Sequence, residues 1–299
     1  MATFNAFQAM QVPSRSISLP ARLLHPTSLK IEEMFKKLKT WDSPSAAVTF
    51  SGIEAIQTGL IRLAELYACV EELFHSPLTQ KALNNQQHVE LVEEALDRSI
   101  GLLDACSNAR ELISSMKEQM QDLQSALRRR GGDYSTIETS IQAYINFRKK
   151  SKKDIAKCLG ALKKIENVHL TNADHQYLFL VIKVLKESSA ITISIFKSLL
   201  LFLSMSVTKS KSRGWSVLIS KIIPVEKGHK VINEVECTEM ALYSLQVQMR
   251  GNNGKADVQM ALKKLETVDG SIRGLERGLD CLFRGLIQNR MSLLNALTP

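Results

Sequence analysis

The sequence predicts an all-α protein, an elongated antiparallel helical bundle with two long helices and a disordered N-terminal tail. Its 299 residues include only 14 glycines and 7 prolines, too few to turn the many short strands of a β-sandwich or barrel. Hydrophobic residues make up 44% of the chain, which is enough to close a core. They recur three or four positions apart along most of the chain, the spacing of one buried helix face.

The N-terminal segment and the first helix differ in composition. Residues 1–27 are rich in Ser, Pro and Arg without steady periodicity, so we expect a disordered tail there. Residues 28–299 are expected to form a single helical-bundle domain. The first helix is predicted over about 28–41, and its buried stripe consists of Ile31, Met34, Phe35, Leu38 and Trp41.

Two capping boxes mark the starts of later helices, because a serine hydroxyl and a glutamate three residues on can satisfy orphan N–H groups reciprocally. Ser51 with Glu54 predicts a helix that stops at Pro77, and Ser135 with Glu138 predicts one that runs to about 165. Further helices are predicted over about 174–207, 215–223 and 231–249.

Two segments predict unusually long helices. Residues 88–129 contain no Pro and only one Gly, which predicts a helix about 60 Å long. Residues 257–296 carry a heptad seam, whose mean spacing of 3.5 favours packing against a partner helix of similar length. The two long helices can be partners within one chain, and homodimerisation through the seam is the alternative. The seam consists of Ala261, Leu265, Val268, Ile272, Leu275, Leu279, Leu282 and Leu286.

The most apolar run of the chain, residues 190–207, has two interpretations. It is shorter than a membrane span requires and carries Lys197 near its middle, where a charge is costly in lipid. We therefore expect a buried core helix, with a membrane-inserted segment as the alternative.

The cysteines indicate a reducing compartment, since their number is odd, their spacing is wide and no C-x-x-C occurs. We expect an intracellular protein, in the cytoplasm or peripheral to a membrane. Residues 1–31 lack acidic side chains, which also fits a plastid transit peptide, but three prolines in them argue against its amphipathic helix. His169 and His175 flank one short loop, but no Cys or second carboxylate cluster joins them, so neither a metal site nor a cofactor is expected.

Eight short segments distributed over the chain form a specific set. They are PSRSISLPAR at 13–22, HP at 25–26, LTQKAL at 78–83, LLDAC at 102–106, QDLQSALRRR at 121–130, WS at 215–216, LFRGLI at 282–287 and RMSLLN at 290–295. Together they resemble the plant Bypass-related family, proteins with a domain of unknown function (number two-four-one). Ala21 departs from the family pattern, which often has Ser there, and so does the long apolar run.

The resemblance implies a plant protein connected with root and shoot development, without an established enzymatic activity and with no catalytic residues to transfer. The sequence agrees, because it contains no P-loop, dinucleotide-binding glycine pattern, nucleophile elbow or H-E-x-x-H motif. We therefore do not expect an enzyme.

The tail carries a candidate phosphorylation motif formed by Arg15, Ser16, Ser18 and Pro20. It fits R-S-x-S-x-P, the pattern that fourteen-three-three adaptors bind once the second Ser is phosphorylated. A phosphate adds nearly two negative charges that an arginine cluster can bind. The alternative is an inert linker.

Positive charge is concentrated between residues 128 and 164, with eleven Lys and Arg against three Asp and Glu. Helical geometry predicts one basic arc opposite a buried face. The arc consists of Lys149, Lys150, Lys152, Lys153, Lys157, Lys163 and Lys164. It could be a solvated surface, bind an anionic membrane, or bind an acidic protein or, non-specifically through its phosphates, a nucleic acid. No aromatic residues interleave these lysines, so specific nucleic-acid recognition is not expected.

We therefore expect a non-enzymatic interaction or scaffold protein acting in root and shoot development. The alternative is a peripheral membrane-binding helical protein that uses the basic arc. In both cases we expect a closed apolar interior between the two long helices.

Overall fold

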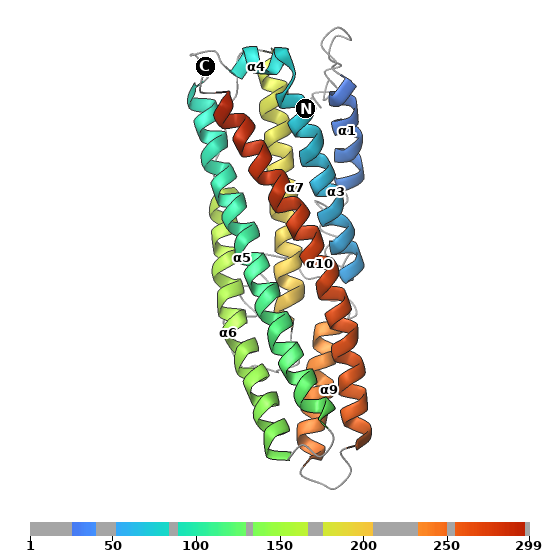
Figure 1. Cartoon of the computed structure of the whole chain (residues 1–299). Helices are drawn as coiled ribbons and strands as arrows, with labels where there is room; N and C mark the ends of the chain where they lie inside the picture. Colours follow the sequence, from blue (N-terminus) through green and yellow to red (C-terminus); the bar gives the residue numbers. More distant parts are fainter. Residues whose placement is uncertain are drawn as a thin grey trace, which may run out of the picture.

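The computed structural model describes residues 26–39, 52–83, 89–129, 134–166, 176–205, 233–249 and 255–296. These residues form eight α-helices and no strand, so the all-α prediction is confirmed for this part of the chain. The longer helices lie along one long axis, and the short α4 (Pro77–Leu83) lies across one end of the bundle (Figure 1). Residues 1–25 of the predicted tail, Trp41 and the predicted helix at 215–223 lie outside the described residues.

The two longest helices, α5 (Val89–Arg128) and α10 (Lys255–Asn295), have 40 and 41 residues and run antiparallel (Figure 1). Ion pairs of 2.6–2.8 Å join them at three levels, Arg110–Asp280, Lys117–Glu276 and Arg128–Glu266. The predicted seam of α10 is buried, since none of its eight side chains is more than 3% exposed. It packs within the chain, where α10 contacts α3, α5 and α9.

Helix α3 (Ile53–Phe74) runs parallel to α10, so the bundle is not antiparallel throughout. Gln57 Nε2 donates to the Ser271 carbonyl at 2.8 Å, and the Asn289 amide donates to the Tyr67 carbonyl at 2.8 Å, so residue numbers rise together along both helices. The reason is that α10 has a broad apolar face that packs on α3 as well as on α5. The short α1 (Pro26–Leu38) covers the outer side of α3.

Glycines on α10 allow α3 to approach closely. A Cβ added to Gly278 would lie 2.9 Å from the Leu60 Cβ, and one added to Gly285 would lie 3.2 Å from the Tyr67 Cβ. Gly270 lies about two turns before Gly278, and a Cβ added there would have nothing within 4 Å. The α3–α10 packing therefore depends on the absence of side chains at particular positions.

Two helices placed end to end, α7 (Gln176–Ser204) and α9 (Glu234–Gln248), together span the length of the bundle. Helix α6 (Tyr134–Glu166) returns antiparallel to α5, α7 runs back beside α6, and α9 continues beyond the end of α7 (Figure 1). Asn233 joins the two helices. Its Oδ1 accepts from the Glu236 N–H at 2.8 Å as the α9 N-cap, and its Nδ2 donates to the Phe202 carbonyl at 2.9 Å.

Neither predicted capping box places the start of its helix correctly. Helix α3 has Gly52 at its N-cap, with no side-chain cap bond, and α6 already begins at Tyr134, so Ser135 is inside the helix. Pro77 ends the helix predicted before it but also begins a further one, α4 (Pro77–Leu83), which the sequence analysis did not predict. Pro is favoured at the first position of a helix, because the N–H it lacks would have no partner there.

The apolar run is a core helix, as predicted. In α7, Ile195, Phe196 and Leu199 are at most 1% exposed, and Lys197 reaches the Glu166 carboxylate at 2.8 Å. Among the helices described, none combines the length and hydropathy that crossing a membrane requires.

Candidate functional site

The outer side of α6 carries six exposed lysines, here called the α6 lysine face. They are Lys149, Lys150, Lys153, Lys157, Lys163 and Lys164. The opposite side of the helix is in the core, where Ile155, Leu159 and Leu162 are at most 4% exposed. Asp154 lies beside this face, with its carboxylate 3.1 Å from the Lys157 Nζ. One carboxylate does not balance six lysines, so the face keeps a strong positive charge.

Lys152, the seventh residue of the predicted arc, is partly buried and lies near Glu239 of α9. Burial lowers the pKa of its ammonium group, and nearby Arg148 lowers it further, while Glu239 acts in the opposite direction. Its position at the edge of the arc explains the difference, because helix periodicity does not show where a neighbouring helix begins to cover the surface.

The motif formed by Arg15, Ser16, Ser18 and Pro20 lies outside the described residues, as do His169 and His175. Within the described ranges, no group of three or more His, Cys, Asp or Glu side chains is arranged to hold a metal ion.

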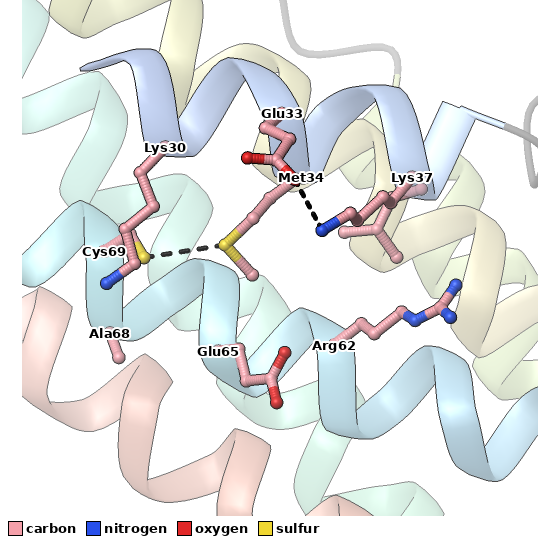
Figure 2. Close-up of a pocket in the computed structure, with 9 residues that line it drawn as sticks. Lys30, Glu33, Met34, Lys37, Arg62, Glu65, Ala68 and Cys69 are labelled. Atoms are coloured by element: carbon pink, nitrogen blue, oxygen red, sulfur yellow. Dashed lines mark hydrogen bonds and ion pairs between the residues drawn. The ribbon is translucent and has the colours of Figure 1, made fainter. Parts of the chain in front are cut away.

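A groove of about 610 Å³ lies between α1 and α3. Figure 2 shows Lys30 and Lys37 reaching into it from α1, with Arg62 and Glu65 on the α3 side. Its floor is sulfur-rich, with the Cys69 Sγ 3.5 Å from the Met34 Sδ. The charged residues that line the groove include both cations and carboxylates.

The thiol at the floor of this groove is not activated. Burial raises the pKa of Cys69, although Lys30 beside it acts in the opposite direction. Glu33 forms an ion pair with Lys37 of the same helix at 2.7 Å, and this contact lowers the Glu33 pKa. The groove therefore has charged walls and an apolar floor, but no nucleophile poised to react.

A second, smaller cavity lies inside the bundle where α3, α5, α7 and α10 meet. Its volume is about 30 Å³. Its lining includes Tyr67, Arg98, Ser188, Asn289 and Arg290, and no Asp or Glu. The expectation of a wholly apolar interior is therefore wrong at this level of the bundle.

The polar groups of this inner cavity are held in fixed orientations. Asn289 donates both to the Tyr67 carbonyl and to the Gly285 carbonyl, at 2.8 and 2.9 Å, which turns its Oδ1 away from them. Arg290 donates to the Leu96 carbonyl at 2.6 Å and to the Ser99 hydroxyl at 2.8 Å. These bonds place side chains from separate helices around one small space.

Sequence reasoning did not identify the inner cavity, although one signal was available. The steps of three and four that define the α10 seam continue from Leu286 to residue 289 and then to Leu293. An Asn therefore occupies a seam position, where a polar side chain is expected to have a specific role. Nothing in the sequence indicated that Arg98 and Ser188, from two other helices, lie at the same level.

Comparison with known proteins gives one positive result. Residues 59–296 match the family described as Protein BPS1, whereas neither the curated proteins nor the solved structures give a match. This family is defined by the domain of unknown function numbered seven-nine-three, so the number two-four-one is wrong. The match extends from the second turn of α3 to the end of α10 and so includes the inner cavity and the α6 lysine face. The chain therefore belongs to the BPS1 family, the Bypass-related family that its sequence motifs resemble.

Proposed function

We propose that this protein is a non-enzymatic interaction or scaffold protein acting in plant root and shoot development. The observation that carries the proposal is the α6 lysine face, six cations presented on a helix whose other side is fixed in the core. Such a face binds partners by charge complementarity and does not require movement of the bundle. Its expected partner is an acidic protein surface.

The test compares capture of partners by matched variants. The full chain with Lys149, Lys153, Lys157 and Lys164 changed to Glu is compared with the wild type and with a control. The control reverses four lysines exposed on other helices, Lys36, Lys37, Lys263 and Lys264. Proteins captured from plant tissue by the wild type and the control, but lost from the α6 variant, support the proposal. An identical set of captured proteins for all three contradicts it.

An anionic membrane is the alternative partner of the same face. Each cation near an anionic lipid surface contributes about 1 kcal/mol to binding, so the face could hold the bundle at a membrane. The same variants separate the two functions by flotation with vesicles with and without phosphatidylserine. Salt-sensitive flotation that requires the α6 lysines supports the membrane function, and its absence together with protein capture supports the scaffold.

The tail offers a second contact, in which phospho-Ser18 is bound by a fourteen-three-three adaptor. Phosphorylated and unphosphorylated peptides 10–25 would be compared in a pull-down, and equal, negligible binding would reject this contact. Homodimerisation would need a surface other than the α10 seam, which is buried within the chain. We infer an intracellular setting from the unpaired cysteines, and imaging a fluorescent fusion in root cells tests it.

A further inference from the structure

The outer side of α9 is an exposed apolar surface, here called the α9 stripe. Met240, Tyr243 and Val247 are 44%, 63% and 55% exposed, and their spacing of three and then four residues places them on one face of the helix. The opposite face is in the core, where Leu242 and Leu245 are at most 1% exposed. A helix that is apolar on both sides is normally covered on both. The exposed fractions show that no described helix covers the α9 stripe.

The chain that connects α7 to α9 starts and ends beside this stripe. The Asn233 Nδ2 donates to the Phe202 carbonyl at 2.9 Å and lies 3.0 Å from the Met205 Sδ, so the two ends of the connection meet at the start of α9. The connection itself, residues 206–232, lies outside the described ranges. At 1.5 Å per residue, the α9 stripe begins about 10 Å from Asn233 and ends about 21 Å from it.

Residues 215–223 of this connection, WSVLISKII, have the pattern of an amphipathic helix. Four large apolar residues follow the spacing i, i+3, i+4 and i+7, which places them on one face: Trp215, Leu218, Ile219 and Ile222. A helix of nine residues is about 13 Å long, close to the distance of about 10 Å along α9 from Met240 to Val247. The segment therefore matches the α9 stripe in length and in apolar character.

Chain length allows the segment to reach the α9 stripe. Residues 206–214 and 224–232 join it to α7 and α9, and a connection of nine residues spans about 30 Å when extended. A second exposed apolar surface, on α10, is much farther away. It consists of Ile287, Met291 and Leu294. The Thr238 hydroxyl donates to the Lys264 carbonyl at 3.4 Å, so the start of α9 is level with about residue 269, and the second surface begins about 27 Å farther along α10.

Charge and covalent connection favour this segment over an unlinked partner. Residues 206–232 carry six Lys and Arg against one Glu, while α9 carries three Glu and no Lys or Arg, so the helix does not repel the segment. A segment held at both ends beside its docking surface has an effective concentration on the order of millimolar, which a second copy of the chain or a separate protein would have to exceed.

We infer that residues 215–223 pack as an amphipathic helix on the α9 stripe, with the face of Trp215, Leu218, Ile219 and Ile222 turned toward α9. This contact removes two apolar surfaces from water at once, which is the driving force for it. It also covers the second side of α9, whose first side packs on α10 and α6. A second copy of the chain and a separate protein are the competing occupants of the α9 stripe.

The test uses tryptophan fluorescence of the purified full chain. The sequence has two tryptophans, Trp41 and Trp215, so the Trp41→Phe variant reports on Trp215 alone. We expect Trp215 to emit at a shorter wavelength in the folded chain than in urea, and acrylamide to quench it at least threefold less strongly. Equal quenching in the two states would overturn the inference. Protection that develops only as the protein concentration rises would also overturn it, because the occupant would then be a second copy.

Substitutions in the α9 stripe assign the contact. Met240→Glu combined with Tyr243→Glu places two charges on an exposed face and is expected to raise acrylamide quenching of Trp215 at least twofold. The matched control, Met291→Glu, changes an equally exposed methionine of α10 and is expected to leave quenching unchanged. No effect of the α9 substitutions, or equal effects of the α9 and α10 substitutions, would contradict the docking.

Hydrogen exchange provides a second readout that does not require the Trp41→Phe variant. Amides of residues 215–223 are expected to exchange at least tenfold faster in the chain with Met240→Glu and Tyr243→Glu than in the wild type. Identical exchange in the two chains would also reject the contact. None of these variants alters the α6 lysine face, so the result is independent of the proposed function.

Discussion

Arg148 is the most deeply buried cation among the ion pairs of the described helices. Its side chain is 5% exposed, its Nε lies 2.6 Å from the Glu239 Oε1, and its Nη2 donates to the Met205 carbonyl at 2.9 Å. One side chain on α6 therefore holds both the end of α7 and the body of α9. Its importance comes from burial, because an unpaired charge in this position could not be hydrated.

Replacing Arg148 by Met is expected to lower the free energy of unfolding by about 3 kcal/mol, because Glu239 is left buried without its main partner. Changing Glu239 to Leu in the same chain is expected to restore a large part of this loss. Urea unfolding measures both variants. As a control, Lys157→Met removes an exposed pair and is expected to cost less than about 1 kcal/mol. Equal losses of unfolding free energy for Arg148→Met and Lys157→Met would show that burial does not determine how much an ion pair contributes to stability.

Cys106 gives a second prediction at this scale, concerning alkaline pH. Burial raises the pKa of its thiol from 9.0 to about 12, so the folded chain holds this proton more tightly than the unfolded chain. Its stabilising contribution is complete below pH 9 and is lost as the pH rises toward 12. We expect Cys106→Ala to reduce the fall of unfolding free energy in this range by up to about 1.4 kcal/mol per pH unit.

The matched control is Cys281→Ala, which changes an exposed thiol and is expected to leave the pH profile unchanged. Buried Tyr67 and Tyr144, whose pKa values burial raises to about 12, continue the decline above pH 10 in all variants. Identical profiles for the wild type and Cys106→Ala would contradict the assignment.

At the scale of the element, the crossing of α3 and α10 depends on the shape of the helix surfaces. Leu60 packs directly on the backbone of Gly278, while Gly270 on the same helix faces open space. Glycine normally destabilises the interior of a helix by about 0.5 to 1 kcal/mol relative to alanine. Gly278 therefore has a packing role that outweighs this cost.

Gly278→Ala is expected to destabilise the chain by about 1 to 2 kcal/mol, since overpacking outweighs the gain in helix propensity. Gly270→Ala adds the same methyl group in open space and is expected to stabilise it by about 0.5 to 1 kcal/mol. Thermal unfolding of the two variants should therefore shift in opposite directions. Stabilisation by both substitutions would show that the close contact between Gly278 and Leu60 does not contribute to the free energy of unfolding.

At the scale of the whole molecule, α5 and α10 are held along their length by apolar packing together with three ion pairs. The ion-pair side chains are between 28% and 57% exposed, whereas Leu275 and Leu279 of the seam are completely buried. Exposed pairs contribute little because water and salt screen them, and buried leucines contribute several kcal/mol each.

Changing Arg110, Lys117 and Arg128 together to Gln is therefore expected to cost at most about 2 kcal/mol at low salt and less at high salt, because salt screens exposed pairs. The single change Leu275→Ala is expected to cost about 3 kcal/mol or more. Denaturant titrations at low and high salt compare the two. A larger loss for the triple variant would mean that charge pairing holds the two long helices together.

Particular residues show how far the sequence predicts this fold. Every member of the α10 seam is buried as its spacing predicts, and the two long helices end within two residues of their expected bounds. Pro77 shows the limit, since a residue that ends one helix also begins the next. Lys152 shows the same limit at the candidate site, because it is partly buried near Glu239 of α9, a helix remote in sequence.

The sequence by itself determined the described helices other than α4, their buried faces, the concentration of charge on α6 and the family motifs, because these depend on residue type and local spacing. Only the tertiary structure decided that α3 runs parallel to α10, that Gly278 contacts Leu60, and that Arg98, Ser188 and Asn289 surround one cavity. The physical reason is that helix periodicity fixes the direction of each side chain around its own axis, whereas neighbouring side chains from different helices are fixed by packing between helices.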